Sequence, residues 1–353
     1  MNKTMKKLSL GVSGVAVAAM LLSGCSSTST SAPSKSKDSS STASTATPRV
    51  SIMVGGLEKI IYMPYMLAEK LGYYKDAGVT VTLVEESAGQ DAELALLAGQ
   101  VDGAGGFYDH TLDLQTKGKK VEAVVTMADV PGEQLMVANR LKDKVKTLAD
   151  LKGLTIGVTG LGSSTNMLAS YNVVKGGNKE SDYKPLPVGA GQTLIAAMQN
   201  NRIDAAVTSE PTATLLKNKN LAFTFVDMNS KEGTEAALGG KYASTSLYMS
   251  NDYVKKNPEI VQKLANAYVR TLKWMSSHTP EEIASMMPEE YYAGDKAVYI
   301  QALKGQLPMF TTDGKMPSGD PENVQKILSA FKPAVKSVDL SQTYTNEFVD
   351  KVK

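Results

Sequence analysis

Apolar and polar residues follow the same order in two stretches of the chain, and the two stretches predict the same local structure. Each stretch starts with a short apolar run of strand length, continues with residues at helical spacing, and ends in a second short run. The first stretch gives a strand at 50–54, a helix at 64–71 and a strand at 79–84, and the second gives a strand at 154–158, a helix at 164–174 and a strand at 183–188.

The segments that follow align without a gap. Residues 88–106 read AGQDAELALLAGQVDGAGG and residues 190–208 read AGQTLIAAMQNNRIDAAVT, with six identities in nineteen positions. Gly99 aligns with Asn201, and Gly and Asn are the residues that most readily adopt the left-handed conformation at the end of a helix. Each copy therefore predicts a helix, a left-handed cap and a strand that starts near Val101 or Ile203.

The unit strand-helix-strand-helix-strand thus occurs twice. Strands that alternate with helices are typical of a parallel sheet with right-handed crossovers. Chance similarity between two common βαβ patterns is the alternative explanation. We favour a repeat, because the cap positions match together with the identities.

Two further strand-length segments indicate where the chain crosses from the first unit to the second and where it returns. Residues 134–139 (QLMVAN) form the outgoing strand and residues 244–249 (STSLYM) the returning strand. After them Asn257-Pro258 opens a helix, with Pro in the first turn. Further helices are predicted at 280–286, 296–303 and 321–331, and we expect them to pack on the first lobe. The predicted class is α/β, with two βαβαβ lobes joined by a hinge of two crossings.

The N-terminal region has the layout of an export signal. Lys3, Lys6 and Lys7 precede an uncharged, mostly apolar run from Leu8 to Leu22, which is shorter than a comfortable membrane span. Residues 22–25 (LSGC) resemble the bacterial lipobox, in which cleavage before the cysteine frees a thiol for lipid attachment. We therefore predict a signal peptide at 1–24 and a lipid anchor on Cys25; plain secretion with an unmodified thiol is the alternative.

A polar segment follows the cysteine. Residues 26–48 carry no large apolar side chain, so they predict a flexible tether within 25–48. The Ser/Thr-rich composition favours a Gram-positive cell, with the protein anchored on the outer leaflet of the cell membrane. The remaining boundaries place lobe 1 at 49–138 plus 248–353 and lobe 2 at 139–247.

Charge and cysteine content exclude several classes of protein. The chain has 38 basic and 36 acidic residues, and removal of the three lysines before Cys25 leaves 35 basic residues, so nucleic-acid binding is not expected. A single cysteine permits no internal disulfide. With two histidines in the chain, a His/Cys metal site is excluded, whereas an all-carboxylate site stays open.

Four loops at the carboxyl ends of predicted strands are candidates for a ligand site, because ligands of open α/β sheets bind there. Where two such sheets face each other, these loops meet in one cleft. The candidate residues are Gly56, Leu57, Glu58 and Tyr62 in the first loop, Gly106, Phe107, Tyr108 and Asp109 in the second, Gly162, Ser163, Ser164 and Thr165 in the third, and Ser209 and Glu210 in the fourth.

The third loop, GLGSST at 160–165, carries the most specific pattern. It follows a strand and opens a helix, so its backbone N–H groups and hydroxyls suit an anionic or polar ligand group. It also resembles a dinucleotide fingerprint, but Thr165 stands where the last Gly or Ala belongs. An ordinary helix N-cap is the structural alternative.

The other loops have structural alternatives too. Phe107 and Tyr108 either stack on a ligand or pack at a strand end, and Glu210-Pro211 either aims a carboxylate at a ligand or ends a strand. Asp109-His110 is more typical of a turn than of a catalytic pair. The sequence lacks the G-x-S-x-G, H-E-x-x-H, P-loop and C-x-x-C motifs, so an enzyme is not expected.

Five blocks, taken together and in order, resemble the solute-binding proteins of ABC importers. The blocks are MPYMLAEKLGYYKDAGVTVTLVE, ALLAGQVDGAGG, LADLKGLTIGVTGLGSST, NNRIDAAVTSEP and SLYMSNDYVKKNPEIVQKL. The resembling group includes alkanesulfonate-, taurine- and nitrate-binding proteins and binders of thiamine pyrimidine precursors. The resemblance implies a type II periplasmic-binding-protein fold, a ligand trapped between two lobes, and delivery to a membrane permease driven by an ATPase. It places the ligand loops on the same four segments.

The ligand class stays open at this level. The loops contain Glu58, Asp109 and Glu210 but no arginine, and Lys59 is the nearest cation. A small organic anion of the sulfonate type is slightly favoured, and a pyrimidine or other aromatic heterocycle is the alternative. An exported enzyme or a sensor on the same fold is the alternative of another class. We expect a monomer with no cofactor and no metal.

Overall fold

A computed structural model describes residues 47–353 of the chain. The predicted signal peptide, Cys25 and nearly all of the predicted tether lie outside the described residues. Within the described residues, no helix combines the length and the apolar character that a membrane span requires.

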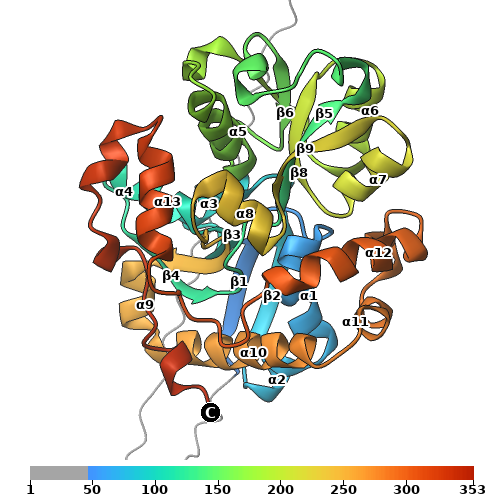
Figure 1. Cartoon of the computed structure of the whole chain (residues 1–353). Helices are drawn as coiled ribbons and strands as arrows, with labels where there is room; N and C mark the ends of the chain where they lie inside the picture. Colours follow the sequence, from blue (N-terminus) through green and yellow to red (C-terminus); the bar gives the residue numbers. More distant parts are fainter. Residues whose placement is uncertain (1–46) are drawn as a thin grey trace, which may run out of the picture. The chain divides into compact units, whose positions relative to one another are not determined.

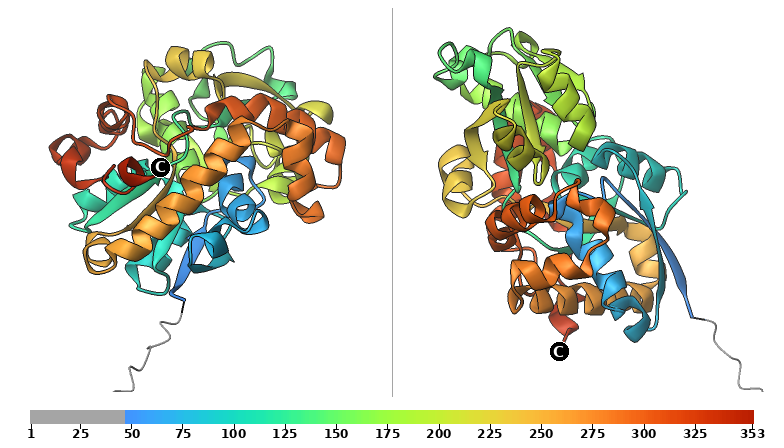
Figure 2. Two further views of the ribbon diagram at one scale, coloured as in Figure 1. Left: turned by 90° about the horizontal axis from the view of Figure 1, so that it is seen from below. Right: turned by 90° about the vertical axis from the view of Figure 1, so that its right-hand side faces the viewer.

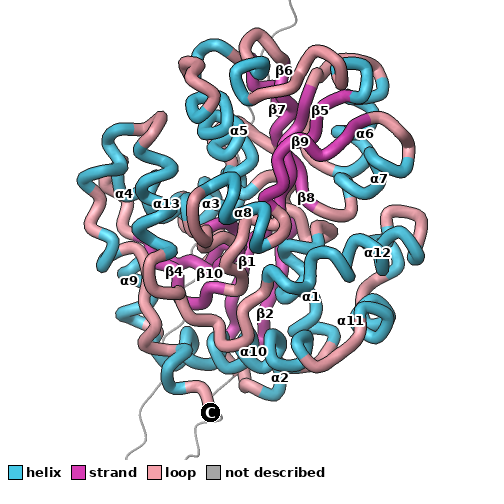
Figure 3. The backbone as a smooth tube through the Cα atoms, in the orientation of Figure 1, coloured by secondary structure: helices cyan, strands magenta, loops and turns pink. Residues whose placement is uncertain are grey.

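The described residues form two five-stranded sheets with helices packed around them (Figures 1 and 3). The strands are β1 Arg49–Val54, β2 Thr80–Glu85, β3 Gly103–Phe107, β4 Val121–Thr126, β5 Glu133–Ala138, β6 Thr155–Val158, β7 Lys184–Pro187, β8 Ala205–Ser209, β9 Ala222–Met228 and β10 Thr245–Ser250. The helices are α1 Met63–Lys70, α2 Tyr73–Asp76, α3 Gly89–Leu97, α4 Asp109–Thr116, α5 Ser164–Lys175, α6 Gly191–Gln199, α7 Thr212–Asn218, α8 Lys231–Leu238, α9 Asn251–Lys256, α10 Pro258–Ser276, α11 Pro280–Met286, α12 Lys296–Gln306 and α13 Asp320–Ser329.

The two sheets have equivalent strand orders. The first is β2-β1-β3-β10-β4 and the second is β7-β6-β8-β5-β9. In each sheet the first three strands run parallel, as predicted, and the edge strand beyond the fourth position has the same direction. The fourth position holds an antiparallel strand: β10 beside β3 in the first sheet and β5 beside β8 in the second. The predicted α/β class with parallel βαβαβ units is confirmed, and the antiparallel strand of each sheet is the one that the crossing segment brings from the other lobe.

The internal repeat is confirmed in its details. Gly99 and Asn201, which follow α3 and α6, have φ values of +69° and +56°. Asp102 Oδ2 accepts a hydrogen bond from Ser51 N at 2.8 Å, and Asp204 Oδ2 accepts one from Thr155 N at 2.9 Å. In both lobes the same aspartate therefore ties the start of its own strand to the neighbouring parallel strand.

Strand exchange moves the lobe boundaries that we predicted. Strand β5 pairs with β8 and β9, so residues 133–138, which we assigned to lobe 1, lie in the second sheet. Strand β10 pairs with β3 and β4, so residues 245–247, which we assigned to lobe 2, lie in the first sheet. The predicted boundary after residue 138 therefore misplaces the whole of β5, and the boundary after residue 247 misplaces half of β10.

The two crossing segments, 127–132 and 239–244, run side by side and are held together by hydrogen bonds. Backbone bonds join Tyr242 N to Asp129 O at 2.9 Å and Ser244 N to Ala128 O at 3.0 Å. Lys241 Nζ also donates to the Asp129 carboxylate at 2.7 Å. This paired connection is the covalent link between the lobes (Figure 2, right).

The long helix α10 packs against α1 and α2 beneath the first sheet. Its Leu264, Tyr268 and Leu272 are fully or almost fully buried, and the Tyr268 hydroxyl accepts a hydrogen bond from Tyr74 at 2.9 Å. The expectation that the C-terminal helices pack on lobe 1 holds for α10, whereas α12 also contacts α7 of lobe 2.

Candidate functional site

A small cavity lies where the strand ends of the two lobes meet. Its volume is about 10 Å³, which is about the space of one water molecule, so the lobes are closely apposed around it. Thirteen residues line it: Gly55, Lys59, Ile61, Tyr62 and Gly89 from lobe 1, and Glu133, Thr159, Ser163, Ser164, Thr165, Ala190, Thr208 and Ser209 from lobe 2. Five predicted site residues, from the first, third and fourth loops, are among them: Tyr62, Ser163, Ser164, Thr165 and Ser209; the second loop contributes none.

Lobe 1 contributes a buried amine and a buried phenol. Lys59 is 6% exposed, and its Nζ donates to the carbonyl oxygens of Gly55 at 2.5 Å and Ser87 at 2.9 Å. Burial lowers the pKa of Lys59, and the neighbouring acids Glu58 and Glu133 raise it in part. Both of these hydrogen bonds go to backbone carbonyl oxygens of its own lobe, so they hold the amine in place at the cavity.

Lobe 2 contributes a carboxyl group that the sequence analysis missed. Glu133, the first residue of β5, is 3% exposed, and its Oε2 has no hydrogen-bond partner. Burial and then the nearby Asp109 raise the pKa of Glu133 to about 8, while Lys59 lowers it. The sequence offered one signal for a site residue here: an acidic residue directly after Pro131-Gly132, at the start of a strand-length segment.

The GLGSST loop supplies hydroxyls, but most of them satisfy the loop itself. Ser163 Oγ accepts from the N–H of Asn166 and thereby caps α5, and it also donates to Gly160 O at 2.7 Å. Thr165 Oγ1 accepts from Thr159 N at 2.9 Å. The structural alternative, a helix N-cap, is therefore present, while Ser163, Ser164 and Thr165 also line the cavity.

A hydrogen bond crosses from lobe 1 to lobe 2 at Asp109, which is fully buried at the start of α4. Its carboxylate accepts from Ser164 Oγ at 2.8 Å and from Tyr242 OH, on the crossing segment, at 2.7 Å. Ser164 Oγ also lies 3.2 Å from His110 Nε2. Asp109 thus contacts the second lobe through Ser164 and the hinge through Tyr242, instead of serving only as a turn residue.

The remaining candidates of the first loop, Gly56, Leu57 and Glu58, do not line the small cavity. Leu57 is buried, and Gly56 has a φ of +112°, a conformation that favours glycine. Glu58 lines a neighbouring pocket of about 250 Å³ at the lobe junction, which also contains Tyr291, Glu290 and Leu215. This pocket and the small cavity share Lys59 and Ala190, so the two spaces adjoin.

The other candidates of the second loop, Gly106, Phe107 and Tyr108, also lie outside the cavity lining. The Tyr108 hydroxyl lies 2.5 Å from Thr343 Oγ1 and its ring packs on Tyr344, so this side chain joins the C-terminal segment. Phe107 and Gly106 are buried at the end of β3, where the Phe107 ring meets the edge of Tyr62 at 6.4 Å between centroids. The packing alternative applies to both aromatic residues.

Glu210 also lies outside the lining. Its Oε2 accepts from Thr214 N at 2.8 Å, and its Oε1 accepts from Gln134 Nε2 at 3.0 Å, so the carboxylate fixes the start of α7 instead of pointing into the cavity. Its backbone oxygen accepts from Ile60 N at 3.1 Å, a second hydrogen bond between the lobes. Gly162, with φ of +86°, lets the third loop approach Gln90 of lobe 1.

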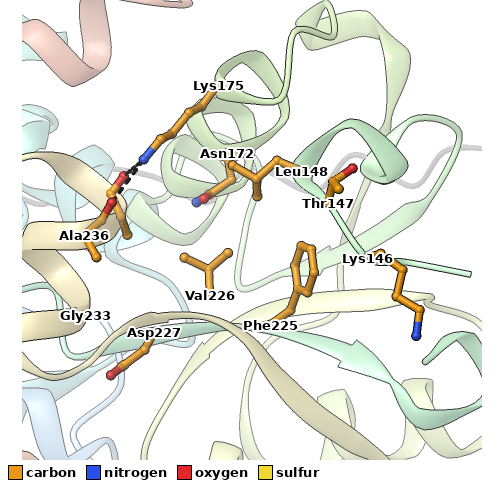
Figure 4. Close-up of a pocket in the computed structure, with 11 residues that line it drawn as sticks. Lys146, Thr147, Leu148, Asn172, Lys175, Phe225, Val226, Asp227, Gly233 and Ala236 are labelled. Carbon is orange, nitrogen blue, oxygen red and sulfur yellow. Dashed lines mark hydrogen bonds between the residues drawn. The ribbon is translucent and has the colours of Figure 1, made fainter. Parts of the chain in front are cut away.

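A larger cavity of about 440 Å³ lies wholly in lobe 2, among the residues around α5, β9 and α8 (Figure 4). Phe225, Val226 and Leu148 face it, and Lys175 donates to the carbonyl oxygens of Ala236 and Ala237 at its edge. It contacts no residue of lobe 1, so a ligand there would not link the lobes. The small interlobe cavity is the better candidate despite its size, because both lobes line it.

Within residues 47–353, no three His, Cys, Asp or Glu side chains lie close enough together to hold a metal ion. The described residues at the interlobe cavity can contact a ligand through hydrogen bonds and charge.

The chain is similar in sequence to one protein family and to several characterised proteins. A family model described as NMT1/THI5 like matches residues 60–283. The 4-amino-5-hydroxymethyl-2-methylpyrimidine phosphate synthase THI11 of Saccharomyces cerevisiae is 24% identical over 237 residues, which are 63% of this chain and 65% of the yeast protein. The riboflavin-binding protein RibY of Chloroflexus aurantiacus is 24% identical over 322 residues, covering 85% of this chain and 86% of RibY. The chain thus spans slightly less than two thirds of the yeast synthase.

Solved structures resemble the whole two-lobe unit. A protein of Bordetella bronchiseptica RB50 superposes with a TM-score of 0.83 at 34% identity, covering 86% of this chain and 96% of that one. The alkanesulfonate-binding protein SsuA of Xanthomonas axonopodis pv. citri gives a TM-score of 0.66 at 19% identity, covering 83% of this chain and 95% of SsuA. The predicted periplasmic-binding-protein fold is confirmed by these likenesses and by the equivalent sheets.

Proposed function

Because the chain belongs to the NMT1/THI5-like family, we propose that it is the extracytoplasmic solute-binding protein of an ABC importer. The observation that carries the proposal is the cavity lined by polar groups of both lobes beside a paired hinge. The names of RibY and SsuA, two binding proteins that cover most of this chain, support the same role.

Lobe closure is the mechanism that this arrangement favours. A cavity of about 10 Å³ holds no organic solute, so the lobes separate to admit one and close around it. A ligand that contacts both lobes favours the closed form by its differential affinity. The closed form then docks on a permease, and an ATPase drives release of the solute into the membrane path.

The ligand has two candidate classes. A small organic anion of the sulfonate type draws support from the name of SsuA and from the N-terminus of α5 with its Ser and Thr hydroxyls. A pyrimidine or other heterocycle draws support from the names of the yeast synthase and RibY, and from Tyr62 at the cavity.

Attachment to the membrane through Cys25 belongs to the same proposal. A lipid on this cysteine would hold the protein at the outer face of the cell membrane, and residues 26–48 would act as its tether. Metabolic labelling with a palmitate analogue should label the wild-type protein and leave Cys25→Ser unlabelled. Equal labelling of the two would contradict the anchor.

An enzyme is the second candidate function, since the yeast relative is named as a synthase. The observation in its favour is the contact of Ser164 with His110 across the lobes, at 3.2 Å. Incubation of the purified protein with a bound compound distinguishes the two: recovery of the unchanged compound supports binding, and turnover supports an enzyme.

Thermal unfolding with a ligand panel tests the import role. The panel holds methanesulfonate, taurine, nitrate, riboflavin and 4-amino-5-hydroxymethyl-2-methylpyrimidine. A ligand at 100 times its dissociation constant should add about 2.7 kcal/mol to the free energy of unfolding. Small-angle scattering with the bound compound should then report a more compact particle, and an unchanged particle would contradict closure.

A further inference from the structure

We propose that Glu133 selects the ligand, so that the interlobe site takes a neutral or cationic nitrogen compound that donates N–H hydrogen bonds and rejects small anions. This inference rests on the proposed solute-binding function and names the ligand class. The carrying observation is the side chain of Glu133, which is 3% exposed, lines the interlobe cavity and leaves Oε2 without a partner among the described residues.

A buried carboxyl oxygen without a donor is costly, and native proteins rarely retain one without a reason. The other polar groups of the site do not supply the donor. Lys59 donates to Gly55 and Ser87, and Ser164 and Tyr242 donate to Asp109. A ligand N–H group that enters between the lobes would supply the donor that Glu133 lacks.

The charges around the cavity point to the same ligand class. Glu133 and Asp109 approach the site from opposite lobes, and Glu58 lines the adjoining pocket. Lys59 is the only cationic side chain among the thirteen lining residues, and its amine is already bonded twice. Lys59 is thus the one cation that a sulfonate or nitrate would meet among the lining residues, and Glu58 already interacts with it, while the anion would also enter near the Asp109 carboxylate. Burial of an anion with incomplete charge compensation is unfavourable.

Proton exchange gives the inference a second, independent readout. The raised pKa of Glu133, about 8, keeps its carboxyl protonated near neutral pH, with Asp109 favouring the proton and Lys59 opposing it. An N–H donor, above all a cation, stabilises the ionised carboxylate, so its binding should release a proton to the buffer. An anion stabilises the protonated form, so its binding should release none.

The test compares matched probes on the purified chain by calorimetry in two buffers of different ionisation enthalpy at pH 7. Methylguanidinium and 4-amino-5-hydroxymethyl-2-methylpyrimidine are the donor probes, and methanesulfonate and nitrate are the anions. We expect a donor probe to bind wild type with proton release, and Glu133→Gln to weaken that binding about tenfold or more and abolish the release. Glu122→Gln, the same change on β4 outside the cavity lining, should leave both unchanged.

Three results would overturn the inference: tighter binding of an anion than of either donor probe, no binding of either donor probe, or equal affinity of wild type and Glu133→Gln. Binding of an anion with lobe closure in scattering would leave the import function standing and remove only this ligand class. Binding of a donor probe without lobe closure would support this ligand class and contradict the closure mechanism of the import function.

Discussion

The two lobes share a framework and differ in what they present to the cleft. Asp102 and Asp204 make the same strand-to-strand bond, and Gly99 and Asn201 end equivalent helices in the same left-handed conformation. The cleft loops differ: lobe 1 presents Lys59 and a tyrosine, whereas lobe 2 presents a carboxyl group and a set of hydroxyls. The comparison teaches that the repeat specifies the fold of each lobe, while differences between equivalent loops specify the chemistry of the site.

Strand exchange is the source of one major difference. Lobe 1 receives β10 and lobe 2 receives β5, at equivalent positions in the two sheets. The first residue of β5 is Glu133, which lines the cavity, whereas Thr245 of β10 is buried and donates to Ile61 O at 3.0 Å. Equivalent positions therefore carry a cavity-lining carboxyl in one lobe and a hydroxyl bonded within its own lobe in the other.

The largest expected effect concerns pH and the carboxyl of lobe 2. The pKa of Glu133 is about 8 in the folded chain and near 4.5 when the side chain is exposed. Between pH 4.5 and pH 8 the carboxyl is therefore protonated in the folded state and ionised in the unfolded state. The free energy of unfolding therefore falls as pH rises through this window, by an amount on the order of a few kcal/mol. Asp109 and Lys59 are the charged groups that act on it.

Urea unfolding of wild type and Glu133→Gln at pH 5, 7 and 8.5 measures this effect. The variant should match wild type near pH 5 and become more stable than wild type as the pH rises. Asp320, whose pKa is raised to about 7, adds a dependence of the same sign to both proteins, so the difference between them isolates Glu133. Equal slopes for the two proteins would contradict the buried, protonated carboxyl.

A smaller effect is expected at Gly55, the residue after β1. An added Cβ there would lie 2.6 Å from the backbone of Gly89, so the backbone must move. Gly55→Ala should destabilise the chain by about 1–3 kcal/mol through overpacking. In lobe 2, Thr159 directly follows β6 and carries its own side chain, so Thr159→Ala is the matched control with the smaller loss in chemical denaturation. A greater loss for the control would contradict the assigned close approach.

The smallest effect concerns the shared framework. Asp102→Asn and Asp204→Asn should each reduce stability by about 1 kcal/mol, because each carboxylate accepts a backbone N–H of the neighbouring strand. Neither change should alter ligand affinity, since neither residue lines the cavity. A binding defect in either variant, with stability intact, would show that the framework and the site are not separable.

Much of the framework was predictable because its signals are local. Apolar runs, the Asn257-Pro258 helix start and the left-handed positions Gly99 and Asn201 each act within a few residues of sequence. The hydroxyl loop was found for the same reason. Membership of β5 and β10 in the opposite sheets was not predictable, because it depends on pairing between distant strands.

The missed and displaced site residues follow from that non-local step. Glu133 reaches the cleft only because β5 enters the second sheet, so sequence placed it with lobe 1 and assigned it no role. Tyr108 and Glu210 have residue types that suit a ligand, but contacts with Thr343 and Thr214 decide where they point. Loop position was therefore predictable, and side-chain direction was not.

A reversible cross-link between the lobes would decide whether the ligand enters between them. The added Cβ of Gly160 would lie 3.0 Å from the Cβ of Ala88 in the other lobe, slightly closer than the ~3.5–4.5 Å of a disulfide, so a small shift admits one. Ala88→Cys and Gly160→Cys are combined with Cys25→Ser, which removes the only native thiol. Calorimetry with the probe panel then compares the oxidised and reduced forms. We expect that oxidation abolishes binding and that reduction restores it. Equal affinity of the two forms would contradict it and would move the ligand to a site within one lobe.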